Sequence, residues 1–232
     1  MRMNKLVYVA AGLIGFMAGF LSTLHAQPAQ RFDLKVRQDF FAGFNGDSEA
    51  LARGMRASEE ALAANPKFGE ALVWHGSGLM FQAGQAFGSG DQAKGSELWS
   101  RALKEMQTAV ELEPDNVAVR IPRGATLLQT SHHVSEAMAK PLLELGLADY
   151  QRSYELQQSY LETLGTHPRG ELLFGLAEGY GREGDEAKAE KFFELIRTSL
   201  PNTVYAKRAD EWMKNKSLPV SETGCVGCHV AK

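Results

Sequence analysis

The chain contains 232 residues, of which 44% are hydrophobic, 23% are charged and only two are cysteines. This composition is typical of a globular protein and excludes collagen-like, low-complexity and disordered chains. The formal net charge of −3 provides no basic excess for binding nucleic acid.

The N-terminus carries an uncharged apolar segment. Two basic side chains occur in the first five residues, and no charged residue occurs in residues 6–24. Ala26 then supplies a small residue before a polar continuation. A basic start, an apolar stretch and a small residue at the cleavage position are typical of a secretory signal. Residues 1–26 are therefore predicted to form a signal peptide.

The same segment is also long enough to cross a bilayer as a helix. An uncleaved membrane anchor formed by residues 6–24 therefore remains an alternative to a cleaved signal. In both cases the basic end stays inside and the rest of the chain is exported. We expect a periplasmic protein that is either soluble or anchored to the cytoplasmic membrane by its N-terminus.

The long middle part of the chain shows helical periodicity and no alternating strand pattern. Apolar residues recur at spacings of three and four, among many Ala, Leu, Glu, Lys and Gln residues. Helices are predicted over residues 49–64, 96–112, 142–163, 171–180 and 186–200. Because proline cannot continue a helix, prolines are expected to end four of these stretches. These prolines are Pro66, Pro114, Pro168 and Pro201.

Residues 170–201 predict two helices joined by a turn over residues 181–185. They read GELLFGLAEGYGREGDEAKAEKFFELIRTSLP and resemble the tetratricopeptide repeat, a helix–turn–helix unit of about 34 residues. The residues at the packing positions of that family are Leu173, Leu176, Ala177, Tyr180, Ala189, Phe193 and Pro201. Pro168 and Pro201 are 33 positions apart, which is close to the family period.

Two upstream units resemble the repeat more loosely because they are longer. Pro66 and Pro114 are 48 positions apart, and Pro114 and Pro168 are 54 positions apart. Insertions are expected over residues 85–95, which are rich in glycine and serine, and over residues 131–141.

The resemblance implies an all-α, helix–turn–helix solenoid over residues 27–216. Gly76 and Gly124 occupy the small position of the first helix in the two longer units. A half-unit over residues 47–66 is expected to cap the front. A helix over residues 203–214 is expected to close the back of the array.

A tetratricopeptide-like solenoid implies a concave groove that binds a protein partner. Four aromatic residues lie around the first insertion, and they either line this groove or belong to the core: Trp74, Phe81, Phe87 and Trp99. The sequence contains no nucleophile–base pattern, phosphate loop or paired-carboxylate motif. We therefore expect a binding protein or electron carrier and no enzyme.

Both cysteines lie in the last eight residues, in the sequence Cys225-Val226-Gly227-Cys228-His229. This CxxCH pattern resembles the haem-attachment motif of c-type cytochromes. Thiols at that spacing can form thioethers with the two vinyl groups of one porphyrin. The adjacent imidazole can then be the proximal ligand of the iron. One covalent haem c is predicted, bound through Cys225 and Cys228 with His229 on the iron.

Two other uses of the motif stay open. The thiols could form a redox disulfide, although no thioredoxin-like pattern surrounds them. They could also bind zinc together with His229, although a fourth ligand is missing. Residues 217–232 are predicted to be a flexible linker and tail.

The sixth ligand of such a haem cannot follow the motif, because only three residues come after His229. It must come from upstream, from another chain, or be absent. The upstream candidates are His132, His133 and Met213. His75 is instead expected to be a hydrogen-bonded core histidine, because it lies in a helical pattern.

These features together predict an exported c-type haem protein. A tetratricopeptide-like scaffold would dock a protein partner, and a single haem on the tail would transfer electrons. One alternative is a periplasmic scaffold or assembly factor without a redox role. Another is a haem gas binder or sensor similar to the cytochrome c prime proteins, with an open sixth position.

Overall fold

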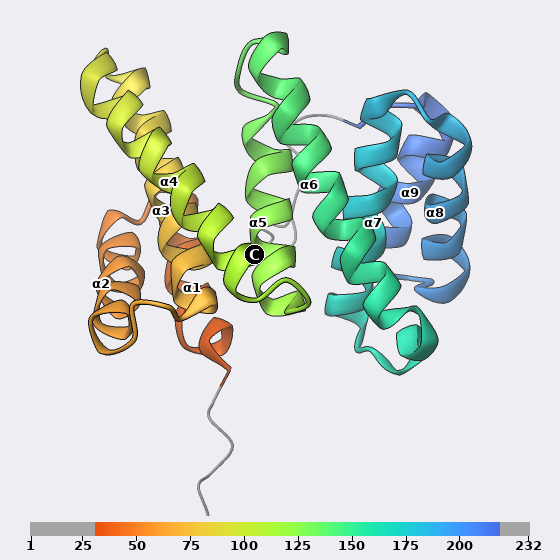
Figure 1. Cartoon of the computed structure of the whole chain (residues 1–232). Helices are drawn as coiled ribbons and strands as arrows, with labels where there is room; N and C mark the ends of the chain where they lie inside the picture. Colours follow the sequence, from red (N-terminus) through yellow and green to blue (C-terminus); the bar gives the residue numbers. More distant parts are fainter. Residues whose placement is uncertain (1–30, 219–232) are drawn as a thin grey trace, which may run out of the picture. The chain divides into compact units, whose positions relative to one another are not determined.

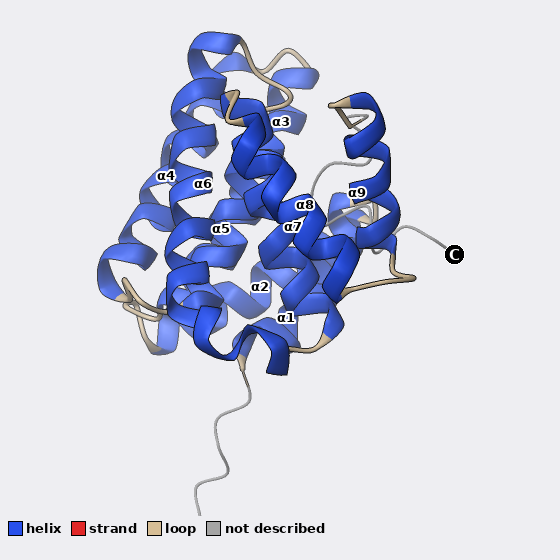
Figure 2. Cartoon of the chain, turned by 90° about the vertical axis from the view of Figure 1, so that its right-hand side faces the viewer, coloured by secondary structure: helices blue, strands red, loops and turns tan. Residues whose placement is uncertain are grey.

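The computed structural model describes residues 31–218. All the regular elements in this part of the chain are helices, and no strand occurs in it (Figures 1 and 2). The all-α class predicted from the sequence is confirmed. The predicted signal or anchor over residues 1–26 and the motif over residues 225–229 lie outside the described residues.

Nine α-helices and one short 3₁₀ helix make up the described part of the chain. Their bounds are α1 Phe32–Phe44, α2 Ser48–Ala64, α3 Gly69–Gly88, α4 Gln92–Leu112, α5 Val117–Thr130, α6 Glu136–Gln157, η1 Gln158–Thr163, α7 Thr166–Glu183, α8 Glu186–Ser199 and α9 Val204–Asn215. Consecutive helices pack as four hairpins, α1–α2, α3–α4, α5–α6 and α7–α8, and α9 packs on α8. The fold is an all-α, solenoid-like array of helical hairpins (Figure 1).

The odd-numbered helices form a layer of their own. Helix α3 packs against both α1 and α5, and α5 also packs against α7. Residues of these four helices line one large cavity, which is described below. The hairpin connectivity therefore places one helix of each hairpin on the side of the cavity.

The predicted closing helix is present as α9. Its Trp212 is buried and stacks on Phe193 of α8 with 4.6 Å between ring centroids. The indole also approaches Gly181 of α7, where a Cβ would lie 3.3 Å from Nε1. Helix α9 therefore covers apolar surface of the last hairpin, as the sequence predicted.

The glycines predicted to occupy the small position do allow helices to approach closely. A Cβ on Gly76 would lie 2.8 Å from a side-chain carbon of Met106 in α4. A Cβ on Gly124 would lie 3.1 Å from the carbonyl oxygen of Gly146 in α6. Both distances are shorter than normal carbon contacts, so a side chain at either glycine would push the two helices of its hairpin apart.

Three of the four hairpins turn through a Gly-Asp pair. The glycines have positive φ angles of 105° at Gly46, 88° at Gly90 and 85° at Gly184, which glycine adopts without strain. The aspartates that follow accept a hydrogen bond from the backbone N–H three residues later and cap α2, α4 and α8. The third hairpin instead turns through residues 131–135, which contain neither glycine nor aspartate.

The first predicted insertion, over residues 85–95, is not a loop. Helix α3 continues to Gly88 and α4 begins at Gln92, so the extra residues lengthen both helices. The ring of Phe87 packs where a Cβ of Gly95 would be, and its centroid lies 6.4 Å from that of Trp99. These contacts continue the hairpin packing and explain why the helices extend.

The second predicted insertion, over residues 131–141, is only partly a loop. A turn occupies residues 131–135, and α6 begins at Glu136 and includes Pro141. Other extra residues of this unit form η1. Pro141 is the sixth residue of α6 and lies beyond the first four N–H groups of the helix, so it leaves the carbonyl oxygen of Ala137 without its intrahelical donor.

Two further details of the prediction were wrong. Pro168 does not end a helix but lies in the first turn of α7, where its missing N–H costs no hydrogen bond. Residues 47–66 do not form a half-unit, because α1 precedes α2 and completes the hairpin. The apolar side chains of Phe32, Val36 and Phe40 bury one face of α1.

A buried ion cluster fixes α5 against α6. Asp149 is fully buried in α6, and its carboxylate accepts hydrogen bonds from Arg120 at 2.7 Å and from Arg123 at 2.6 and 2.9 Å. Arg123 also donates to Gln107 of α4 at 2.8 Å. Helices α4, α5 and α6 are thus joined by one polar network, which positions the α5 side chains that line the cavity.

Candidate functional site: a groove along the odd-numbered helices

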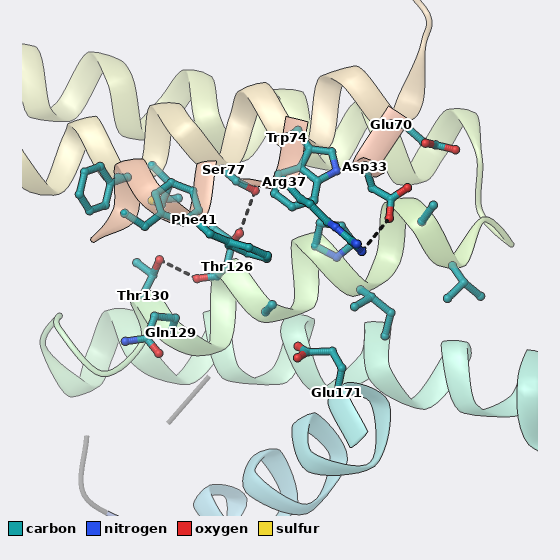
Figure 3. Close-up of a pocket in the computed structure, with 18 of the residues that line it drawn as sticks. Asp33, Arg37, Phe41, Glu70, Trp74, Ser77, Thr126, Gln129, Thr130 and Glu171 are labelled. Carbon is teal, nitrogen blue, oxygen red and sulfur yellow. Dashed lines mark hydrogen bonds and ion pairs between the residues drawn. The ribbon is translucent and has the colours of Figure 1, made fainter. Parts of the chain in front are cut away.

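A groove of about 1200 Å³ lies among the described residues. Its walls come mainly from α1, α3 and α5, and the start of α7 contributes His167, Pro168 and Glu171 to the lining, of which Glu171 is labelled in Figure 3. Small-molecule sites commonly enclose about 300–1,000 Å³, so this groove is large enough for a cofactor or for a segment of a partner protein.

Aromatic side chains dominate one wall of the groove. Trp74 lies 5.3 Å from Phe40 and 5.9 Å from Phe41, measured between ring centroids. Phe44 and Phe81 are 5.2 Å apart. The four aromatic residues singled out in the sequence all line the groove, and Trp74 belongs to the core as well.

Hydroxyl groups join the two walls at the floor of the groove. Thr126 of α5 donates a hydrogen bond of 2.8 Å to Ser77 of α3 (Figure 3). Ser77 in turn donates to the carbonyl oxygen of Val73 at 2.8 Å. Short side chains at this crossing let α3 and α5 approach, while larger side chains on either side leave the cavity between them.

One end of the groove, which we call the charged end, is defined by Arg31, Asp33, Arg37, Glu70 and Asn116. Asp33 is paired with Arg31 at 2.8 Å and lies 4.0 Å from Arg37. Glu70 accepts a hydrogen bond of 3.1 Å from the backbone N–H of Phe32. Asp33 is therefore paired with cationic side chains of the same chain, whereas Glu70 is hydrogen-bonded to neutral donors.

Trp74 contributes a buried polar group that has no hydrogen-bond partner among the described residues. Its side chain is only 6% exposed, and its Nε1 donates to no acceptor. Buried polar groups in proteins are nearly always paired, so an orphan donor at the wall of a cavity needs a specific explanation. An acceptor group of a bound molecule would provide one.

His132 and His133, two candidates for a sixth haem ligand, lie in the turn between α5 and α6 in different surroundings. Nε2 of His132 lies 2.7 Å from Oε1 of Glu178 and 3.1 Å from Nη1 of Arg182, and its side chain is only 11% exposed. Burial lowers the pKa of the Arg182 guanidinium, and the charge of Glu178 opposes that shift. His132 therefore belongs to a buried cluster with α7.

His133 is exposed and lines the groove. Its Nε2 lies 3.2 Å from the side-chain nitrogen of Gln129, one turn earlier in α5. Met213, the third candidate, is half-buried in α9 and packs against the core of the last hairpins. The structure thus separates three residues that the sequence left equivalent.

The remaining histidines of the groove region have structural partners. His75 is 1% exposed, and its Nδ1 lies 2.5 Å from Oε2 of Glu105, as expected for a core histidine. The hydrogen bond from His75 and the nearby Arg101 lower the pKa of Glu105, although partial burial raises it. His167 contacts the hydroxyl group of Tyr205 at 3.0 Å.

The predicted haem-binding residues Cys225, Cys228 and His229 lie outside the described residues. Within residues 31–218, no group of three or more His, Cys, Asp or Glu side chains could hold a metal ion. The helices described there also include none with the length and apolarity needed to cross a membrane.

Sequence reasoning did not find the charged end or the orphan N–H of Trp74. The residues of the charged end come together from α1, α3 and the start of α5, so no local pattern marks them. The repeated Gly-Asp pair, in contrast, is visible in the sequence before three of the helices. It could have located the turns and shown that the third hairpin differs.

Comparisons with family models, with curated proteins and with solved structures find no match for this chain. The groove and the C-terminal motif are therefore the features from which its function can be argued.

Proposed function

We propose that this chain is an exported c-type haem protein. Its helical array docks a redox partner protein, and one haem on the C-terminal tail exchanges electrons with that partner. The tetratricopeptide-like pattern of residues 170–201 and the CxxCH motif support this combination of a scaffold and a cofactor.

The motif supports the haem because both cysteines of the chain are in it. Cys225 and Cys228 would hold the porphyrin through thioethers, and His229 would bind the iron from one side. A haem bound there supplies a one-electron redox couple. The half-buried aromatic side chains that line the groove offer an apolar surface for a porphyrin.

The observation that carries the docking role is the orphan N–H of Trp74. A hydrogen-bond acceptor of the partner, such as a backbone carbonyl oxygen, would satisfy this donor when the partner enters the groove. Pairing a donor that is already desolvated costs the protein little, so the contact would favour binding. The partner would then lie next to the charged end of the groove.

A scaffold without a redox role is the second candidate. The groove lies wholly within residues 31–218 and needs no part of the tail. A protein that only assembled partners could therefore use the same surface. The two candidates differ in one respect, which is whether the tail carries a covalent haem.

The test is an intact mass and a pyridine haemochrome spectrum of the protein exported from cells that have the c-type maturation machinery. We expect the mass of one covalent haem in the wild-type protein. The double variant Cys225→Ala, Cys228→Ala should be haem-free and should keep the helical far-UV spectrum. A haem-free wild-type protein would reject the electron-transfer role and leave the scaffold. The same mass shows whether residues 1–26 are removed.

A further inference from the structure

We infer that His133 is the sixth ligand of the tail haem, which would lie against what we call the aromatic end of the groove. This end is defined by Phe81, Phe87, Trp99 and Val134, all of which line the cavity together with His133. The inference rests on the proposed function, because it requires the covalent haem.

His133 is the one of the three upstream candidates that can reach a ligand in the groove. Its imidazole is exposed, and its side-chain contact is with the amide of Gln129, which carries no charge. His132 would have to leave Glu178 and Arg182, a buried charged cluster whose disruption is costly. Met213 would have to leave the apolar core that it packs against.

The aromatic end provides the surface that a porphyrin needs. Its three aromatic side chains and Val134 are half-buried, so their exposed faces are apolar and turned to the cavity. They come from the extended part of α3, from α4 and from the turn after α5. A flat apolar cofactor placed there would be covered by protein on more than one side, as in most cofactor sites.

The described chain ends on the same side as His133. Trp212 in the last turn of α9 lies against Gly181 near the end of α7. The next residue, Arg182, contacts His132 and donates a hydrogen bond to the carbonyl oxygen of Leu128 in the last turn of α5. The C-terminal ends of α5, α7 and α9 are therefore neighbours.

The tether is long enough for this arrangement. Seven residues lead from Leu218 to Cys225 and can span at most about 25 Å when extended. Helices α9 and α5 are separated by two interhelix spacings across α7, or about 16–20 Å. The tail can thus bring Cys225 to the α5–α6 turn without any change in the helices.

The coordination itself needs only a neutral imidazole. Nε2 of His133 is the nitrogen that would hold the iron, and Gln129 would give up its contact with that nitrogen. Gln129 would then hydrogen-bond to water, because its side chain is at the surface of the groove. No proton, electron or covalent bond is exchanged in this step.

Optical and electron paramagnetic resonance spectra of the ferric full-length protein test the assignment. We expect a low-spin haem with two histidine ligands in the wild-type protein and little binding of carbon monoxide by the ferrous form. His133→Ala should become high-spin, should bind carbon monoxide readily, and should recover the low-spin spectrum when imidazole is added. The matched control His132→Ala should remain low-spin.

The outcomes separate this inference from the proposed function. A wild-type protein without covalent haem rejects both. A protein with covalent haem whose low-spin spectrum survives His133→Ala, or whose wild-type form is already high-spin, rejects only the His133 ligand. A low-spin spectrum lost on dilution also rejects it, because a second copy would then supply the ligand.

Discussion

The turns of the first, second and fourth hairpins are built from the same Gly-Asp pair, whereas the turn of the third hairpin is built from Ser131, His132, His133, Val134 and Ser135. In the first group, glycine adopts the left-handed backbone that ends one helix, and aspartate caps the next helix. In the third hairpin, the N-cap residue Ser135 makes no side-chain hydrogen bond to the start of α6.

The difference shows that the third turn is held by tertiary contacts and the others by local ones. His132 is fixed by Glu178 and Arg182 of the next hairpin, and Arg182 also donates a hydrogen bond of 3.0 Å to the carbonyl oxygen of Leu128. The third turn lacks the Gly-Asp capping of the other turns. Its residue His133, which follows the half-buried His132, is exposed at the groove.

The largest effect on stability is expected at the tertiary contacts of the third turn. His132→Ala should lower the free energy of unfolding by about 1–3 kcal/mol, because Glu178 stays buried after losing a partner. His133→Ala, at an exposed position, should change it by less than about 0.5 kcal/mol. Urea denaturation of the two variants measures both values. Equal losses would contradict the assignment of His132 to the buried cluster.

The next largest effect is expected at the turn glycines. Gly90→Ala and Gly184→Ala should each lower the free energy of unfolding by about 1–2 kcal/mol, because alanine disfavours a positive φ angle. A Cβ at either position would meet no atom of the surrounding residues within 4 Å, so a clash with the rest of the protein does not contribute. Gly84 lies within α3, and a Cβ there would also meet no atom within 4 Å. Gly84→Ala should therefore raise the free energy of unfolding by about 0.5–1 kcal/mol. Thermal unfolding should show this opposite sign.

The aspartate caps should contribute somewhat less than the glycines. Asp91→Ala removes the hydrogen bond of 3.0 Å to the backbone N–H of Lys94 and should cost about 1 kcal/mol. Ser135→Ala at the equivalent place in the third hairpin should be almost neutral, because no such bond exists there. Chemical denaturation compares the two, and a similar loss in both variants would mean that Ser135 also caps its helix.

The smallest effect is a pH dependence at the fourth turn. The side-chain hydrogen bond of Lys188, together with its backbone N–H, holds the pKa of Asp185 below its usual value of about 3.9. This stabilisation is therefore complete above that value and is lost as the pH falls through the lower pKa of the folded state. Asp185→Asn keeps a capping side chain but cannot titrate. Its melting temperature should fall less than that of the wild type between pH 5 and pH 3.

Local patterns predicted the hairpins well where spacing and composition agree, as in α8 and α9. They placed the extra residues at 85–95 and 131–141 but did not predict which structure these residues adopt. The length of the unit between Pro66 and Pro114 is compatible with a loop or with longer helices. The packing of Phe87 on Gly95 decides between them. The prediction that Pro168 ends a helix was wrong because proline is as compatible with the first turn of a helix as with the residue after its end.

The candidate site depends more on tertiary structure than the helical hairpins do. His132 and His133 are adjacent in sequence, and nothing local indicates which one meets Glu178 and which one faces the groove. The unpaired N–H of Trp74 likewise depends on which atoms the folded chain brings close to the indole, and no local pattern shows this. The C-terminal motif is the opposite case, because its chemistry is contained in five consecutive residues.

The orphan indole has an optical consequence. The chain has three tryptophans, and they occupy three distinct environments: Trp74 in the wall of the groove, Trp99 at the aromatic end, and Trp212 stacked in the closing helix. A bound partner that accepts the Trp74 hydrogen bond would shift the fluorescence emission of that indole and leave Trp212 as an internal reference. The protein thus contains its own reporter of groove occupancy, which needs no added label.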